Sequence, residues 1–144
     1  MSSLIIAIFE ATLQLTMIIM VGLYFVFSNT VMPVLAKHHD GAATMIKINK
    51  KILNPLFMIC FISSGLAGLY FFLLHTGFLA AAGIVFFIGT TIVTIVFNVP
   101  LNDRLKNSLP QKRDEEWIKY LSKWVAWNHV RTLSGIVSAF LLAL

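Results

Sequence analysis

The sequence has few charged residues: Asp, Glu, Lys and Arg make up 12% of its 144 residues, whereas soluble domains carry about 25%. Hydrophobic residues make up 58%, and the mean hydropathy is +0.86. A chain this short, folded in water, would have to expose much of that apolar surface. The composition therefore excludes an ordinary soluble domain and indicates a protein that is solvated by lipid.

Two further absences remove whole classes of site. The only cysteine, Cys60, lies within an apolar run, so the chain has neither an internal disulfide nor a redox cysteine pair. The sequence also lacks a glycine-rich nucleotide loop and the nucleophile elbow of hydrolases. Three converging metal ligands are not found, because His38 and His39 fall in a connection and His75 is predicted to lie across the membrane from His129. We therefore expect no metal and no other cofactor.

Four apolar runs dominate what is present. Each is long enough to cross a hydrocarbon core, which takes about 20 helical residues, and they cover residues 4–27, 52–74, 78–97 and 124–144. Only residues 75–77 join the second run to the third, which predicts an antiparallel hairpin. We expect an all-α polytopic membrane protein, a bundle of four transmembrane helices forming one domain over residues 1–144. A transporter or channel is disfavoured, because the spans show no internal repeat and no continuous polar path.

The basic residues predict the orientation in the membrane. Ten of the eleven Lys and Arg residues lie in the two long connections, 28–51 and 98–123. The positive-inside rule then places both connections in the cytoplasm and both termini outside. The net charge of +5 is therefore a topology signal rather than a sign of nucleic-acid binding. Membrane lipids, including anionic headgroups, are the expected partners.

Small and polar residues follow one stripe on each predicted span, at helical spacing, and such stripes usually face neighbouring helices. The stripes are Glu10, Gln14, Met17, Val21, Tyr24 and Ser28; Asn54, Met58, Phe61, Gly65 and Gly68; Gly83, Phe87, Thr91, Thr94 and Asn98; and Trp124, Asn128, Arg131, Gly135 and Ser138. Most of the polar members belong to the cytoplasmic half, which predicts a polar pocket open toward the cytoplasmic headgroups. Glu10 is an exception nearer the outer end, where it is a protonated structural group, a proton relay or a partner of Gln14.

Two residues of the last span are candidates for chemistry. Arg131 is an arginine inside a membrane span, which costs about 2.5–3.5 kcal/mol on insertion scales and marks a functional hypothesis by default; the alternative is that it snorkels to lipid phosphate. His129 titrates near neutrality and suits a general base or a ligand, or else it is a hydrogen-bonded packing residue. At about 100° per residue, Arg131 and His129 mark the two edges of a polar arc whose middle holds Asn128 and Thr132.

Four groups of residues combine Asn, Pro, Trp and Arg at characteristic spacings. They are Phe27-Ser28-Asn29 with Val31-Met32-Pro33, Asn49 with Asn54-Pro55, Asn98-Val99-Pro100-Leu101-Asn102, and Trp124 with Trp127-Asn128-His129-Val130-Arg131-Thr132. Together they resemble the anthrone oxygenase-like family of small four-helix membrane proteins, most of whose bacterial members are described as a domain of unknown function. The resemblance extends over most of the chain.

The resemblance implies a pocket for a flat, phenolic, partly apolar molecule at the membrane surface, because fungal relatives are associated with the oxygenation of anthrones to anthraquinones without an obvious metal or flavin. His129 is then expected to be the base and Arg131 its electrostatic partner. The expected substrate-binding residues are Asn29, Asn54, Asn98, Asn102, Trp124 and Asn128.

Two functions follow as hypotheses. The first is a cofactor-independent oxygenase of an anthrone-, quinol- or polyketide-like compound. The alternative is a non-enzymatic module that binds a lipid or quinone, or assembles with a partner, through the same pocket. A small apolar or aromatic ligand is expected in both cases. Four spans also offer limited interior, which favours a homo-oligomer; small-residue pairs such as Ser64/Gly68 and Gly135/Ala139 can pack helices within one chain or between chains.

Overall fold

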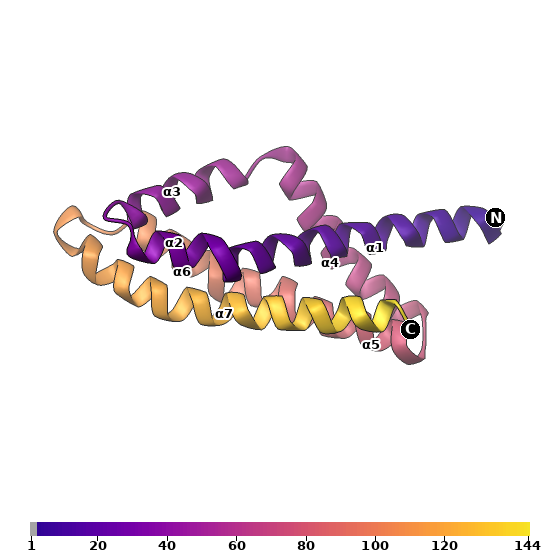
Figure 1. The fold of residues 1–144 in the computed structure, drawn as a ribbon. Coiled ribbons are helices and arrows are strands. Elements are labelled where there is room, and N and C mark those ends of the chain that lie inside the picture. The colour runs from indigo at the N-terminus through magenta and orange to yellow at the C-terminus, as the bar shows by residue number, and fades with distance from the viewer. Residues whose placement is uncertain (1–2) are drawn as a thin grey trace.

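The computed structural model describes residues 3–144, and every regular element in that range is helical (Figure 1). The elements form five continuous helices, so the all-α prediction is confirmed. They are 3–37, made of α1 (Ser3–Val26), η1 (Phe27–Val31) and α2 (Met32–Lys37); α3 (Gly41–Ile52); α4 (Pro55–Leu74); 77–106, made of α5 (Gly77–Phe86), η2 (Phe87–Ile92), η3 (Thr94–Asn98) and α6 (Val99–Lys106); and α7 (Arg113–Leu142), preceded by the 3₁₀ turn η4 (Pro110–Lys112).

Three of these helices are long and apolar enough to cross a membrane: residues 3–37, 55–74 and 77–106. They fit a membrane protein. Helix α7 has the length but is not among the three, since its first half is charged and Arg131 interrupts its apolar half. The predicted count of four spans is therefore not confirmed.

Two helices continue further than the sequence predicts, each past a proline. The apolar runs predict that the first span ends at residue 27 and the third at residue 97, but the helices continue to Lys37 and Lys106. A proline ring clashes with the carbonyl four residues earlier in a regular α-helix. A widened π-turn before each proline relieves the clash, with Met32 N–H donating to the Phe27 carbonyl and Val99 N–H to the Thr94 carbonyl, each five residues back.

The other helix ends follow the sequence signals. Asn54 caps α4, its Oδ1 accepting from the Phe57 N–H at 3.1 Å. Helices α4 and α5 are joined by two residues, and α5 opens on Gly77 at φ 60°, a backbone conformation that favours glycine. The predicted hairpin is confirmed. Helix α7 begins at Arg113, with Asp114 and the two following glutamates in its first turn, where acidic groups suit the helix dipole.

Small residues let the helices approach closely within one chain. Gly83 of α5 lies so near α4 that a methyl group added to it would meet the Gly68 carbonyl oxygen, and one added to Gly135 of α7 would meet Val21 of α1. Ser64 is also buried. These small residues therefore pack helices inside the monomer.

The elements divide between the two ends of the molecule. Both termini and the α4–α5 hairpin lie at one end, and the α2–α3 and α6–α7 connections lie at the other (Figure 1). Helix α7 packs along α1 and α5, while α3 and α6 contact each other at the connection end. The apolar core that includes Phe27, Met45, Leu105, Tyr120 and Trp124 lies where these last elements meet.

Candidate functional site

A cavity of about 340 Å³ lies between α1, α3, α4, the η3–α6 segment and α7. That volume is within the range of about 300–1,000 Å³ that small-molecule sites occupy. Its apolar wall includes Leu23, Phe27, Phe57, Met58 and Phe61. Its polar lining residues are Tyr24, Asn49, Lys50, Thr94, Asn98, Asn102, Asp103, Lys106, Trp124 and Arg131.

Arg131 supplies the charge on the buried polar side of the cavity. The residue is only 6% exposed. Its guanidinium carbon lies 4.5 Å from the centre of the Tyr24 ring and 5.1 Å from that of Trp124, so two aromatic faces flank the cation. Nη1 donates to Thr94 Oγ1 at 3.1 Å, and Nη2 donates to Asn128 Oδ1. These contacts fix the guanidinium and leave it facing the cavity, so snorkelling to lipid is not its conformation here.

No carboxylate in the described chain forms an ion pair with Arg131. The ion pairs within residues 3–144 involve other groups, and Glu10 pairs with His75. Asp103 is the one acidic residue that lines the cavity, and it is exposed. A buried charge usually has a counter-ion, because burial removes it from water. Here neutral oxygens and aromatic rings hold a cation whose charge the protein leaves uncompensated.

Asn128 fixes the position of Arg131 from behind. It is fully buried. Its Nδ2 donates to the Tyr24 carbonyl at 3.1 Å and to Ser28 Oγ at 2.7 Å, and Ser28 in turn bonds Thr132 Oγ1 at 2.8 Å. The bonds tie α7 to the last turn of α1 and to the π-turn η1. Asn128 is thus a positioning residue, since it does not line the cavity itself.

Several buried polar atoms around the cavity lack a hydrogen-bond partner in the described structure. Tyr24 Oη, Asn98 Oδ1, Trp124 Nε1 and Arg131 Nε are four of the five such atoms, and all four residues line the cavity. The fifth, Thr91 Oγ1, belongs to a residue that does not. Buried polar groups nearly always have a partner. These four atoms are the groups that a polar ligand in the cavity could bond.

A second network braces the connection end. The Tyr120 hydroxyl donates to Asn102 Oδ1 at 2.7 Å and accepts from Asn49 Nδ2 at 3.5 Å, joining α7 to α6 and α3. Burial raises the pKa of Tyr120, so its hydroxyl stays protonated and keeps donating at neutral pH. Asn49 and Asn102 are therefore held at the cavity by a neutral group.

The structure brings together only part of the predicted site. Arg131, Asn98, Asn102 and Trp124 line the cavity, and Asn128 lies directly behind Arg131. The others do not line it: His129 and Asn29 are exposed, and Asn54, also exposed, caps α4.

Sequence reasoning did not single out Thr94, Asn49 or Asp103 as site residues. Thr94 and Asn98 lie four residues apart on the predicted inner stripe of the third span, and Tyr24 lies on that of the first. This helical spacing was the signal that could have added Thr94 and Tyr24. Nothing in the spacing distinguishes Asp103 from the other charges of its connection.

The family model described as Anthrone oxygenase matches residues 42–141. The chain belongs to the anthrone oxygenase family. The resemblance inferred from the asparagine, proline and tryptophan motifs is therefore confirmed. The matched region contains Asn98, Asn102, Trp124 and Arg131, whereas Tyr24 and the other cavity residues of α1 precede it.

Searches of the curated proteins and of the solved structures gave no match to this member of the anthrone oxygenase family.

The opposite end of the molecule holds a separate polar cluster. Tyr70 Oη donates to Glu10 Oε1 at 3.0 Å, and His75 Nε2 lies 3.0 Å from the same oxygen. The cluster links α1 to the α4–α5 hairpin. Glu10 therefore bonds neither Arg131 nor Gln14, and of the roles open to it from the sequence, a structural one fits these contacts.

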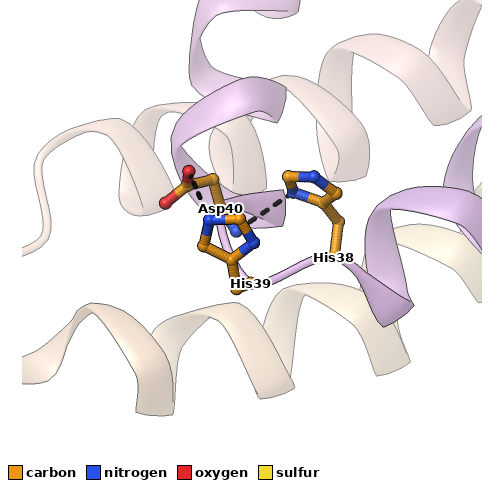
Figure 2. Close-up of side chains that lie close together, drawn as sticks. All are labelled: His38, His39 and Asp40. Carbon is orange, nitrogen blue, oxygen red and sulfur yellow. Dashed lines mark hydrogen bonds and ion pairs between the residues drawn. The ribbon is translucent and has the colours of Figure 1, made fainter.

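One exposed group has the composition of a metal site. His38, His39 and Asp40 follow one another in the turn between α2 and α3, with their ligand atoms within 4.8 Å of each other (Figure 2). They already bond among themselves: the Asp40 backbone N–H donates to His38 Nδ1 at 3.2 Å, and His39 Nε2 lies 2.9 Å from Asp40 Oδ2. All three are exposed and outside the cavity, so we assign them no role in its chemistry.

Proposed function

We propose that this protein is an integral membrane oxygenase that acts, without a cofactor, on an anthrone-, quinol- or polyketide-like compound bound in the cavity. The observation that carries the proposal is a buried, uncompensated Arg131 facing a mostly apolar cavity in a member of the anthrone oxygenase family. Such a cavity accepts a flat ring system on its apolar wall and an oxygen atom on its polar side.

The reaction proposed is the conversion of a ring CH₂ group to a carbonyl. A base removes one proton, and the electron pair left on carbon delocalises onto the ring carbonyl oxygen. The carbanion forms a carbon–oxygen bond to O₂; loss of the second proton then cleaves the O–O bond and releases water. One O₂ is consumed per substrate: one of its oxygen atoms enters the product, and the other leaves as water with the two hydrogens. Arg131 stabilises the oxyanion, a contribution of about 2.7–4 kcal/mol for one donor in other enzymes.

Two residues compete for the role of base. His129 has the suitable chemistry, but its exposed side chain lies outside the cavity. Asp103 lines the cavity together with its neighbour Asn102. Since a base must reach the proton it removes, we assign this role to Asp103 and retain His129 as the rival. Asn98, Asn102 and Trp124 are assigned to substrate orientation.

Oxygen consumption tests the proposal. Purified protein in detergent should consume one O₂ per anthrone supplied, with appearance of anthraquinone absorbance, and chelators should leave the rate unchanged. Protein-free micelles measure spontaneous oxidation. A rate equal to that background, with anthrone shown to bind, would rule the enzyme out.

The second candidate is a module that binds a lipid or quinone without turnover. It is favoured by the apolar wall of the cavity, by the exposed Leu53 and Met58 at its lining, and by the position of His129 outside it. Saturable quenching of tryptophan fluorescence by a quinone, in protein that consumes no oxygen with anthrones, would support this candidate.

The membrane arrangement is also part of the proposal. We place α7 as a fourth crossing because it packs against both α1 and α5 in the bundle, giving four spans in a single domain over residues 1–144. Both termini are then outside, and the two basic connections and the exposed Lys50 and Lys106 of the cavity lining face the cytoplasm.

Cysteine labelling tests this orientation. In a Cys60→Ser background, cysteines introduced at Lys47 and Lys112 should react with an impermeant reagent only from the cytoplasmic side, and one at Thr76 only from outside. The reverse pattern would invert the protein and place the cavity at the outer surface.

A further inference from the structure

The unpartnered atoms around the cavity have a definite hydrogen-bonding character. Arg131 Nε–H and Trp124 Nε1–H are donors, and the Tyr24 hydroxyl donates or accepts. Asn98 Oδ1 is an acceptor, because the Nδ2 of the same amide is occupied in donating to the Trp124 carbonyl at 3.3 Å. The set thus offers at least two donors, one acceptor and one fixed positive charge.

This combination matches one kind of ligand. An oxygen that accepts from several donors beside an unpaired cation is best supplied by an oxyanion, and the amide acceptor requires a protonated hydroxyl on the same ligand. The rings of Tyr24 and Trp124 beside the cation, and those of Phe57 and Phe61 elsewhere in the lining, favour a flat aromatic body.

We propose that the cavity binds planar hydroxyaromatic compounds as their anions, with the ionised oxygen at Arg131 and a remaining neutral hydroxyl at Asn98. This inference rests on the proposed function for its site and goes beyond it in naming the bound form. It predicts that binding lowers the pKa of the ligand, since the anion gains the charge of Arg131 and the neutral form does not.

The other charged groups that line the cavity are not expected to lower the pKa of a ligand bound beside Arg131. Among the described residues, the titratable ones that line it are Tyr24 from α1, Lys50 from α3, Asp103 and Lys106 from α6, and Arg131 from α7. The lining residues that α4 and η3 contribute have no titratable side chain. Lys50, Asp103 and Lys106 are exposed, so solvent and salt screen them.

The test uses 2,6-dihydroxyanthraquinone, an already oxidised ligand whose first ionisation leaves one neutral hydroxyl and shifts its absorbance to longer wavelength, so that no turnover is needed. Its apparent pKa is measured by absorbance in the presence of the protein and in protein-free micelles. We expect the bound ligand to titrate at least one unit lower, which corresponds to tenfold tighter binding of the anion than of the neutral form. An unshifted or raised pKa would overturn the proposal.

Two variants locate the source of the shift. Arg131→Gln should abolish it while binding of 2-methoxyanthraquinone, which has no ionisable group, is retained. Lys123→Gln removes the same charge from an exposed position of α7 outside the cavity and should keep the shift. Equal loss in both variants would assign the effect to net charge alone and contradict the proposal.

Two further measurements use the unmodified protein and remain valid if Arg131→Gln fails to fold. Affinity for the hydroxy ligand should rise about tenfold as pH passes through the ligand pKa, and affinity for the methoxy ligand should stay constant; two parallel pH profiles would overturn the proposal. Anionic phosphatidylglycerol should not displace the bound hydroxy ligand more than phosphatidylcholine does. Selective displacement by phosphatidylglycerol would make the cavity a lipid-headgroup site instead. Failure of oxygen consumption, with the pKa shift present, would remove the oxygenase and leave this inference standing.

Discussion

The two ends of the molecule differ in the partners that they provide for an ionisable side chain between the helices. At the end with the termini, one Glu10 oxygen lies 3.0 Å from both Tyr70 Oη and His75 Nε2. At the connection end, Arg131 is bound by Thr94 and Asn128, both neutral, and flanked by aromatic rings. The first cluster has its own donors and joins two helices. The second retains charge and unpartnered atoms at a cavity, which is why we propose it, and not the first, as a binding site.

The largest expected effect is on the rate of anthrone oxidation, which should depend on Arg131 and not on Glu10. Arg131→Gln should lower the rate of anthrone oxidation by about 10²–10³-fold, since it removes the charge that stabilises the oxyanion. Glu10→Gln should change the rate little, because its cluster lies at the other end. Oxygen consumption by both folded proteins measures this, and equal losses would mean that the two ends act together.

The next effect decides between the two bases. General acid–base assistance is typically worth about 10²–10⁴-fold, so Asp103→Asn should slow turnover by at least tens of fold. His129→Ala should stay within about twofold of the unmodified rate, because its side chain lies outside the cavity. The opposite result would restore the base predicted from the sequence and show that substrate reaches the outer face of α7.

A third comparison asks whether the hairpin end is structural. An added methyl at Gly83 would meet the Gly68 carbonyl and the Phe72 backbone nitrogen, whereas one at Gly22 would meet no atom within 4 Å. Gly83→Ala should therefore destabilise the protein by about 1–3 kcal/mol, the usual cost of overpacking. Gly22→Ala should not be destabilising. Thermal unfolding in detergent measures both, and similar behaviour of the two would contradict the close α4–α5 approach.

The smallest expected effect is on the pH dependence of stability, through Glu116 at the connection end. The hydrogen bond from Arg104, followed by that from Lys119, lowers the pKa of Glu116. A lowered folded-state pKa contributes stability above the unfolded value, here 4.5, that is lost as pH falls below it. Glu116→Gln should flatten this acid part of the melting-temperature profile. The change should be small because the network is exposed and screened; an unchanged profile would mean that the network contributes nothing.

Much of the inner face of each long helix was predictable from spacing, although Asn54 and Met58, on the predicted stripe of the second span, are exposed. Tyr24, Gly68, Thr94 and Arg131 lie on the predicted stripes and are all buried. The helix lengths were less predictable. Pro33 and Pro100 signal helix ends, but a π-turn before each proline lets the helix continue past it. Asn29 lies about 100° from the stripe that passes through Ser28 and is exposed, so its expected place in the site came from the family resemblance and not from helical spacing.

By itself, the sequence determined that this is an apolar, all-helical chain of the anthrone oxygenase family, with its basic residues gathered in two connections and one polar face on each long helix. Composition and helical period suffice for that, because they fix what lipid excludes and which side chains share a face. The tertiary structure alone decided which edge of the polar arc on α7 faces inward. Arg131 and His129 are about 160° apart on the helix, so one faces the cavity and the other faces out. The choice depends on how α7 is rotated against α1 and α5, which contacts between distant residues such as Asn128 and Ser28 fix.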